Sequence, residues 1–281
     1  MNEHAPTNNP ATPIRLIATD MDGTFLGADG FPSQANCEAV CRAAEIGVPT
    51  VFATGRPSRW IQPLDPVRDA HPFVITSNGA VIMDLEHDTV IHHRPLDPAT
   101  VTAVVQDVRS AVPAVSFAVE YLRAWGREEL YPILWYEEAE VIAPIEELLT
   151  HGTAVKLLIR APIPTPDLMA LAAPAVGDRL TVTFSCVTEL GFLEVSPPGI
   201  SKASALRQVL ADLGVPASDV AAFGDMPNDL AMLDLVGHPF VMSNGHDLLK
   251  QRGFPICGHH DDSAFGTTVT EILGLSNGRT E

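Results

Sequence analysis

The sequence predicts an α/β protein in which a doubly wound parallel sheet is interrupted by a smaller, inserted α/β unit. Near both ends of the chain, short apolar runs alternate with helical patterns, which is typical of parallel strands covered by helices on both faces. In the middle, neighbouring strand patterns are joined by short turns, which favours an antiparallel sheet with helices on one side. A chain of 281 residues, 46% of them apolar, can bury a core in each unit.

The first eighty residues contain three strand patterns and one helical pattern. Each apolar run ends in a turn of polar residues and glycine. Ser33 is a suitable N-cap for the helix, and Gly47 is a suitable stop. The expected elements are a strand at Ile14–Thr19, a helix at Ser33–Ile46, and strands at Val48–Ala53 and Phe73–Thr76.

The same alternation of strand and helix patterns returns late in the chain, so we assign residues 1–80 and 197–281 to one core. Gly214 ends the first helix of this second stretch. The expected elements are a helix at Lys202–Leu213, a strand at Val220–Phe223, a helix at Asn228–Val236 and a strand at Phe240–Met242.

The inserted unit is expected over residues 81–196. Its strand patterns are close enough in the chain to pair with their neighbours. The expected elements are a hairpin of Val81–Asp84 and Val90–His92, helices at Asp97–Val112 and Pro166–Ala175, and strands at Ala154–Arg160, Leu180–Cys186 and Phe192–Val195.

The formal net charge of −18 argues against nucleic acid and anionic membranes as partners, because such a field repels phosphate groups. An anionic substrate would need local positive charge. The four cysteines form no Cys-x-x-Cys pair, and the first thirteen residues lack the basic start and apolar stretch of a signal peptide. No apolar run reaches the roughly 18 residues of a membrane span. We therefore expect a cytoplasmic protein with reduced thiols.

Polar residues follow several predicted strands of the core. They are Asp20, Asp22, Thr54, Asn78 and Asp225. Ligands of an open parallel sheet bind beyond the carboxyl ends of its strands, so these side chains are expected to meet at one edge. Any single one of them is equally well explained as an ordinary turn residue.

Asp20 and Asp22 offer two carboxylates one residue apart, which suits a hard cation with oxygen ligands. The pair also suits a division of labour between a nucleophile and a proton carrier. A calcium-binding EF-hand loop is excluded, because Phe25 and Phe31 stand where that loop needs glycine and glutamate.

The segment Asp20-Met-Asp-Gly-Thr-Phe-Leu resembles the first motif of the haloacid dehalogenase (HAD) superfamily. Ser77-Asn78-Gly79-Ala80 before a long insertion is similar to the Cof-type, or subclass IIB, phosphatases. The resemblance implies a Rossmann-like core with an inserted α/β cap domain at residues 81–196. Three further motifs follow in the family's order, namely Thr54-Gly55-Arg56, Lys202 within Gly-Ile-Ser-Lys-Ala-Ser-Ala-Leu, and Gly224-Asp225-Met226-Pro227-Asn228-Asp229.

The resemblance implies a Mg²⁺-dependent phosphatase acting on small phosphorylated metabolites, sugar phosphates first. Asp20 would attack phosphorus to form an aspartyl-phosphate, and Asp22 would protonate the leaving alcohol and later activate water. Mg²⁺ would be bound by Asp20, the backbone carbonyl of Asp22, and Asp225. Thr54 would donate a hydrogen bond to the phosphoryl group, and Lys202 would neutralise the charge of that group and of Asp20.

Other motif residues are expected to support this site. Asp229 would orient Lys202 or hold a metal-bound water. Arg56 is left outside the catalytic set as a local ion-pair partner. For Asn228, capping of the following helix is an equal alternative to phosphate contact. Phosphate contacts are expected from Gly55, Asn78, Gly79 and Asn228.

Three other functions are considered. A specialised sugar-phosphate phosphatase or phosphomutase would share the fold, as would a non-catalytic metabolite-binding regulator. A dehalogenase is disfavoured, because it needs neither the Asp22 acid nor the Asp225 metal ligand. Trp125, Tyr131, Trp135 and Tyr136 either line the substrate pocket or pack under the cap sheet, and the sequence leaves both alternatives open. The run His259-His260-Asp261-Asp262 is interpreted as a solvated loop rather than a metal site.

Overall fold

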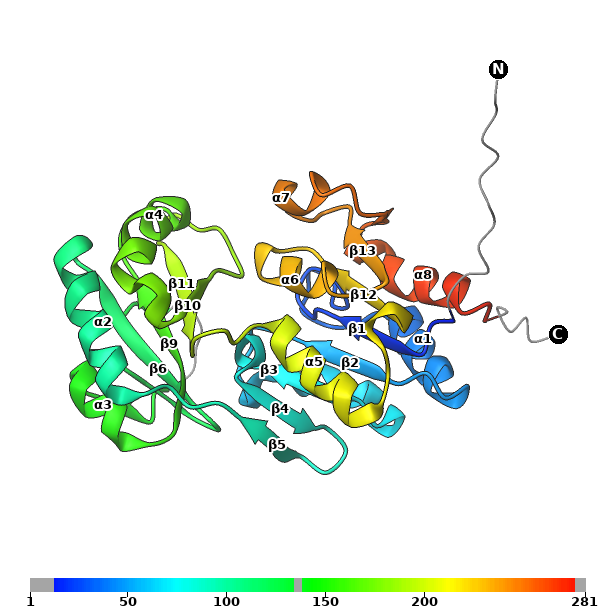
Figure 1. Ribbon diagram of the computed structural model, residues 1–281, viewed down its shortest axis with the longest axis horizontal. Coiled ribbons are helices and arrows are strands. Elements are labelled where there is room, and N and C mark those ends of the chain that lie inside the picture. The colour runs from blue at the N-terminus through cyan, green and yellow to red at the C-terminus, as the bar shows by residue number, and fades with distance from the viewer. Residues whose placement is uncertain (1–12, 134–137, 276–281) are drawn as a thin grey trace, which may run out of the picture.

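A computed structural model of the chain describes residues 13–133 and 138–275, which form two sheets that lie side by side (Figure 1). The larger sheet takes strands from both ends of the chain, in the order β14-β13-β12-β1-β2-β3-β4-β5. The strands from β14 to β3 are parallel, and β4 and β5 extend the sheet as an antiparallel edge. The strands are β1 (Leu16–Thr19), β2 (Thr50–Ala53), β3 (Phe73–Thr76), β4 (Val81–Asp84), β5 (Thr89–His93), β12 (Val220–Gly224), β13 (His238–Met242) and β14 (Ile256–Cys257).

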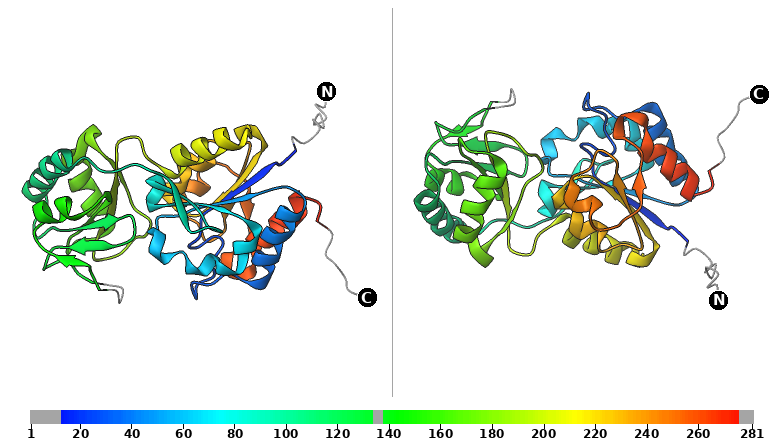
Figure 2. Two further views of the ribbon diagram at one scale, coloured as in Figure 1. Left: turned by 90° about the horizontal axis from the view of Figure 1, so that it is seen from below. Right: turned by 90° about the horizontal axis from the view of Figure 1, so that it is seen from above.

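Helices cover both faces of this sheet, which confirms the predicted fold class (Figure 2). Ile17 packs into the core formed with α1 and α8, whereas Leu16 and Ala18 pack into the core formed with α5 and α6, because successive side chains of a strand point to opposite faces. Ser33 caps α1 by accepting a hydrogen bond from the backbone N–H of Asn36. The helices are α1 (Gln34–Glu45), α5 (Lys202–Leu213), α6 (Leu230–Leu233), α7 (Asp247–Lys250) and α8 (Ala264–Ile272).

The hairpin of β4 and β5 belongs to this larger sheet, so the predicted start of the inserted unit at residue 81 is wrong. The turn at Ser77–Gly79 reverses the chain at once and pairs β4 directly with β3. Val81, Ile82 and Met83 are then buried in the cores of the larger sheet. The chain leaves this sheet only after His93.

The second sheet has the order β10-β11-β9-β6-β7-β8 and is antiparallel except between β7 and β8. Helices α2, α3 and α4 pack on one face, around Val104, Phe117, Leu157 and Leu168. The insertion was expected to be an antiparallel sheet with helices on one side, and the structure agrees. The elements are α2 (Pro98–Ala111), β6 (Ser116–Tyr121), β7 (Trp125–Arg127), β8 (Val141–Ile142), α3 (Ile145–His151), β9 (Ala154–Arg160), α4 (Thr165–Val176), β10 (Thr181–Thr183) and β11 (Phe192–Ser196).

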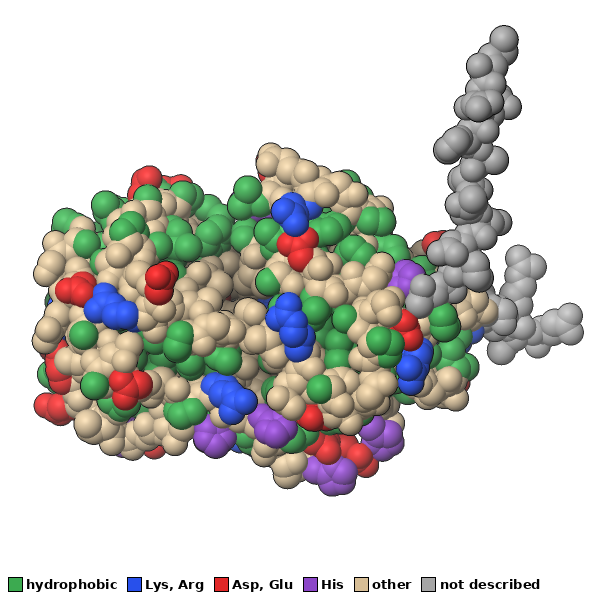
Figure 3. All heavy atoms as spheres, in the orientation of Figure 1, with side chains coloured by type: hydrophobic (Ala, Val, Ile, Leu, Met, Phe, Trp, Pro, Cys, Tyr) green, Lys and Arg blue, Asp and Glu red, His purple; other side chains and the backbone are tan. Residues whose placement is uncertain are grey.

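The surface is hollowed where the two sheets meet, between the parts that carry α4 and α6 (Figure 3). Within the described residues, no helix is both long and apolar enough to cross a membrane. Short 3-10 helices complete the chain, at η1 (Ser58–Trp60), η2 (Gln62–Ala70), η3 (Ser77–Gly79), η4 (Gly177–Arg179), η5 (Ala217–Asp219), η6 (Pro227–Asp229) and η7 (His260–Asp262).

Candidate active site

Three buried carboxylates meet at the carboxyl ends of the two central strands β1 and β12. Asp20 follows β1, Asp225 follows β12, and Asp229 lies in η6; oxygens of all three lie within 4.8 Å of one another. Lys202, the first residue of α5, donates hydrogen bonds of 2.7 Å to Asp20 Oδ1 and to Asp229 Oδ1. The four residues are almost fully buried, so four predicted site residues from distant parts of the sequence form one cluster.

Backbone and hydroxyl donors fix two of these carboxylates. Asp229 Oδ2 accepts hydrogen bonds of 3.0 Å from the backbone N–H groups of Asp225 and Met226, and Asp225 Oδ1 accepts one of 2.9 Å from Thr24. Gly23 has φ of +73°, and a Cβ there would lie 2.4 Å from Asp225 Oδ2. The glycine after Asp22 is therefore required for the close approach of the Asp225 carboxylate.

The cluster carries more negative than positive charge. The three carboxylates of Asp20, Asp225 and Asp229 have one ammonium partner, that of Lys202, so the buried cluster has a formal charge of two negative units. Burial, and next the charge of Asp229, raise the pKa of Asp20 well above its ordinary value, against the opposing effect of Lys202. Burial and Asp229 likewise raise the pKa of Asp225 to about 7. Burial alone would lower the pKa of Lys202, but Asp20 and Asp229 raise it above its ordinary value.

Asp22 is held from the side by Arg56. The Nε and Nη2 atoms of Arg56 donate hydrogen bonds of 2.8 Å and 2.6 Å to the two oxygens of the half-exposed Asp22 carboxylate. Nη1 donates to the carbonyl of Trp60 at 3.1 Å. Sequence reasoning left Arg56 out of the catalytic set, although its position after β2, at the same sheet edge as Asp22, was a usable signal.

Thr54, Asn78 and Asn228, which are predicted to contact the phosphoryl group, lie at the same edge. Thr54 is buried, and its Oγ1 accepts a hydrogen bond of 3.0 Å from the backbone N–H of Arg56. Asn228 Nδ2 donates to Asn78 Oδ1 at 3.0 Å, whereas the N-caps of η6 and α6 are Met226 and Asp229. The capping alternative for Asn228 is therefore not observed.

The two glycines of the predicted phosphate site lie against protein atoms. Gly79 has φ of +106°, and a Cβ there would lie 2.3 Å from the carbonyl oxygen of Ser201, directly before Lys202. A Cβ at Gly55 would lie 3.2 Å from Glu194 Oε1. Gly79 thus allows the turn after β3 to pack against the start of α5.

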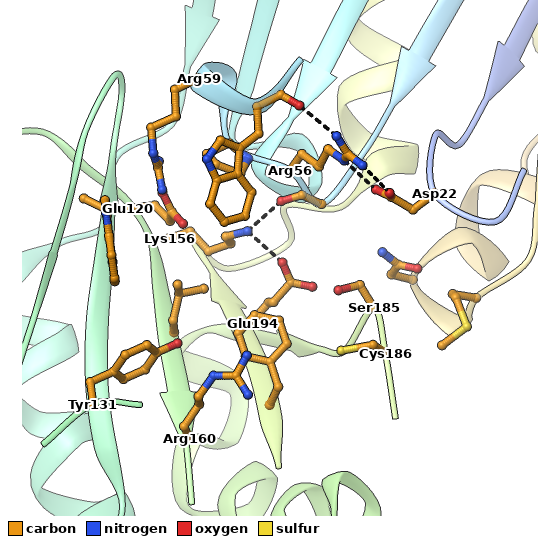
Figure 4. A pocket seen from close by; sticks show the side chains of 18 of the residues that line it. Asp22, Arg56, Arg59, Glu120, Tyr131, Lys156, Arg160, Ser185, Cys186 and Glu194 are labelled. Atoms are coloured by element: carbon orange, nitrogen blue, oxygen red, sulfur yellow. Dashed lines mark hydrogen bonds and ion pairs between the residues drawn. The ribbon is translucent and has the colours of Figure 1, made fainter. Parts of the chain in front are cut away.

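A cavity of about 490 Å³ opens from Asp20 and Asp22 toward the second sheet (Figure 4). On that side, Lys156 Nζ donates hydrogen bonds of 2.7 Å to Glu194 Oε1 and to the backbone carbonyl of Gly55. Arg59 of η1 and Glu120 of β6 form a second ion pair, which joins the core to the second sheet. The sequence analysis missed these residues. Lys156 interrupts the apolar strand Ala154–Arg160, and such a charged residue was a signal for a side chain on the face of the strand away from the apolar core.

The structure describes some of the aromatic residues of the insertion and the histidine run near the C-terminus. Trp125 and Tyr131 line the cavity, whereas Trp135 and Tyr136 lie outside the described residues. Nitrogen and oxygen atoms of the partly exposed His259, His260 and Asp261 lie within 4.8 Å of one another. The other ring nitrogen contact of His260 is with the backbone, since its Nδ1 lies 2.8 Å from the carbonyl oxygen of Leu26.

The sequence of the chain matches a known protein family. Residues 17–267 match the family described as haloacid dehalogenase-like hydrolase. The chain belongs to this family of HAD-like hydrolases. A protein of Streptococcus pyogenes serotype M6 with a provisional phosphatase name is 30% identical over 91% of this chain and 97% of its own length. The HMP-PP phosphatase of Escherichia coli O8 is 27% identical over 92% of this chain and 96% of its own.

Solved structures share the fold of this HAD-like hydrolase. BT1666 of Bacteroides thetaiotaomicron, a HAD-superfamily phosphatase, has a TM-score of 0.81 at 20% identity over 96% of this chain and 99% of its own. The HAD subclass IIB sugar phosphatase BT4131 has a TM-score of 0.80 at 18% identity, over 93% and 100%. These findings confirm the recognised HAD family and the prediction of an enzyme of the phosphatase type.

Proposed function

We propose that this HAD-like hydrolase is a Mg²⁺-dependent phosphatase that hydrolyses small phosphorylated metabolites through an aspartyl-phosphate on Asp20. The observation that carries the proposal is the buried cluster of Asp20, Lys202, Asp225 and Asp229 at the head of a cavity that also holds Asp22. Phosphoryl transfer needs a positioned nucleophile, positive charge near the phosphoryl oxygens and a proton carrier, and each has a candidate here.

The donor set of the cluster fits a divalent cation. Its two excess negative charges would be neutralised by one such ion, and carboxylate oxygens are the ligands that Mg²⁺ prefers. Both oxygens of Asp229 accept hydrogen bonds from Lys202 and backbone N–H groups, which leaves Asp20 and Asp225 to hold the ion. The backbone carbonyl of Asp22 is the third proposed ligand. When bound, Mg²⁺ would supply positive charge to the phosphoryl oxygens.

The first half of the proposed reaction transfers the phosphoryl group to the protein. An Asp20 carboxylate oxygen forms a bond to phosphorus while the bond from phosphorus to the leaving oxygen breaks. That oxygen takes a proton from Asp22, which gives up one of its two hydrogen bonds with Arg56 to carry the proton. Lys202 offsets the charge of Asp20, and the Thr54 hydroxyl donates to the phosphoryl group.

The second half returns the protein to its starting state. A water molecule attacks phosphorus and gives one proton to the Asp22 carboxylate, while the bond from phosphorus to the Asp20 oxygen breaks. Inorganic phosphate leaves, and both aspartates regain their starting protonation. Asp229 holds Lys202 and the backbone of Asp225 in place throughout.

We also propose that the second sheet and its helices, from the end of β5 to residue 196, act as the cap domain. Its contacts with the core at Gly55 and Arg59 hold it over the carboxylate cluster. The cytoplasmic location, the absence of nucleic-acid and membrane partners, and sugar phosphates as the first substrates stay predictions.

The proposal is tested with purified protein, acetyl phosphate and a panel of phosphorylated metabolites, in Mg²⁺ and in excess chelator. We expect hydrolysis in Mg²⁺, loss in chelator and recovery when Mg²⁺ is restored. Mass spectrometry of acid-quenched reactions should find a phosphoryl group on the peptide that contains Asp20. Undiminished activity in chelator, or a phosphoryl group on another residue, would refute the mechanism.

A further inference from the structure

A second cluster of metal-ligating side chains lies outside the candidate active site, at the 3-10 turn η7 near the C-terminus. His259 is the extended N-cap of η7, and His260 and Asp261 lie within the turn. The rings of the two histidines have centroids 4.7 Å apart. The turn thereby brings together three successive side chains, which a regular strand would point to alternate faces.

The two imidazoles face one oxygen of the Asp261 carboxylate without hydrogen-bonding to it. Asp261 Oδ2 lies 3.6 Å from His259 Nδ1 and 3.8 Å from His260 Nε2. These separations are too long for hydrogen bonds, and they are close to the roughly 3.4 Å between neighbouring ligand atoms of a tetrahedral ion with bonds of about 2.1 Å. By contrast, His87 of another exposed cluster lies 2.8 Å from Asp84 Oδ2, so its Nδ1 is already used.

Backbone contacts orient two of the three groups. His260 Nδ1 lies 2.8 Å from the carbonyl oxygen of Leu26; because a carbonyl only accepts, the ring proton lies on Nδ1 and the Nε2 lone pair is available. Histidine ligands of metal ions are commonly fixed through their other nitrogen in this way. Asp261 Oδ1 accepts from the backbone N–H of Ala28 at 2.8 Å, and its other oxygen faces the histidines. His259 Nδ1 accepts a longer hydrogen bond of 3.3 Å from the Asp261 N–H, which an ion would replace.

We propose that His259 Nδ1, His260 Nε2 and Asp261 Oδ2 bind one transition-metal ion such as Zn²⁺, with water completing the coordination. Two imidazoles and one carboxylate favour such an ion over Mg²⁺, which prefers oxygen ligands throughout. The site is separate from the carboxylate cluster proposed to hold Mg²⁺. This inference goes beyond the proposed phosphatase function and does not depend on it.

A bound ion would stabilise the loop that follows β1. The backbone N–H of His260 donates to Asn244 Oδ1 at 3.1 Å, and Asn244 Nδ2 donates to the carbonyl of Gly23 at 2.8 Å. Gly23 lies directly against the Asp225 carboxylate. An ion that binds the folded protein and holds η7 in place should therefore raise the melting temperature.

The test is calorimetric titration of the purified protein with Zn²⁺ in excess Mg²⁺, together with absorption spectra of the Co²⁺-loaded protein. We expect one saturable Zn²⁺ equivalent that Mg²⁺ does not displace. The Co²⁺ spectrum should show visible bands without the intense near-ultraviolet band of a cobalt–thiolate bond. Absence of saturable binding, displacement of Zn²⁺ by Mg²⁺, or a thiolate band would overturn the inference.

Two variants remove a ligand atom but keep the contact that orients it. His260→Asn keeps an N–H donor close to the place of Nδ1, and Asp261→Asn keeps an oxygen that accepts from Ala28. Each should bind Zn²⁺ about 100-fold more weakly or worse, since loss of a merely supporting group costs about 10- to 100-fold. Each should also lose the rise of melting temperature that Zn²⁺ gives the wild-type protein.

His87→Asn is the matched control, because His87 belongs to the other exposed cluster of His and carboxylate groups. This variant should bind Zn²⁺ as the wild-type protein does. Circular dichroism spectra in the absence of Zn²⁺ should be the same for all variants. Wild-type affinity in folded His260→Asn or Asp261→Asn, or loss of binding in His87→Asn, would contradict the assigned ligands.

Discussion

Lys156→Met tests how strongly the buried ion pair beneath Gly55 supports the protein. Lys156 and Glu194 are each 2% exposed, and their charged atoms lie 2.7 Å apart. Removing the ammonium leaves the Glu194 carboxylate buried without a charge partner, which costs about 3 to 5 kcal/mol of unfolding free energy. Replacing both members by apolar side chains, in Lys156→Met with Glu194→Leu, removes the unpaired charge, so most of that loss should be recovered.

The assay is urea denaturation followed by circular dichroism and by tryptophan fluorescence. Lys250→Met is the matched control, because Lys250 is partly exposed in the short helix α7 and its loss should cost about 0.5 kcal/mol or less. A cost below about 1 kcal/mol for Lys156→Met, or a double variant no more stable than the single one, would refute the reasoning.

The same variant has a kinetic consequence. Lys156 also donates to the Gly55 carbonyl, which stands between Thr54 and Arg56 in the turn that holds two proposed active-site groups. Loss of this contact should lower kcat for every substrate by a common factor of about 10 to 100, since small displacements in an active site cost that much. A change confined to the ranking of substrates would show that Lys156 contacts the leaving group instead of positioning the turn.

Three further predictions concern the carboxylates. Asp20→Asn should keep its circular dichroism spectrum and lose several orders of magnitude in turnover; near-normal hydrolysis would exclude the covalent route. Asp22→Asn should be least impaired on p-nitrophenyl phosphate, whose leaving group hardly needs a proton, and an equal loss on alkyl esters would contradict the assigned role. Folding raises the pKa of Asp225 from its ordinary value near 4 to about 7, so without metal this group makes the protein less stable as pH rises through that window. Mg²⁺ competes with that proton, so adding Mg²⁺ should raise the melting temperature more near pH 8 than near pH 5.5. A larger rise near pH 5.5 in thermal scans would count against Asp225 as a ligand.

Local signals predicted the core elements up to β13, because their ends are determined by neighbouring residues, whereas α7, β14 and α8 were not predicted. α5 begins and ends where the sequence analysis placed it, since Ser201 caps it by accepting from the N–H of Ser204 and Gly214 closes it in the left-handed region. The helix expected at Asn228–Val236 is shorter, a 3-10 turn followed by Leu230–Leu233.

Tertiary contacts explain what the sequence did not predict. Strands β6, β7 and β8 and helix α3 were not predicted, and Glu120 interrupts the apolar pattern of β6 because it faces Arg59 of the core. Lys156 and Gly55 are 101 residues apart in the chain. Their contact depends on how the second sheet packs against the first, which no local pattern encodes.

The charge of the cavity also follows from these long-range contacts. The chain carries −18 overall, yet in the described residues the cavity is lined by four carboxylates (Asp20, Asp22, Glu120 and Glu194) and four cations (Arg56, Arg59, Lys156 and Arg160), whose formal charges cancel. Three of these carboxylates are paired with cations from the lining: Asp22 with Arg56, Glu120 with Arg59 and Glu194 with Lys156. Behind this lining, Asp225, Asp229 and Lys202 add one net negative charge, so an anionic ester meets a repulsive site, and a bound divalent cation would make the site attractive. Loss of any one of the paired cations would return a negative charge to the wall that faces the ester.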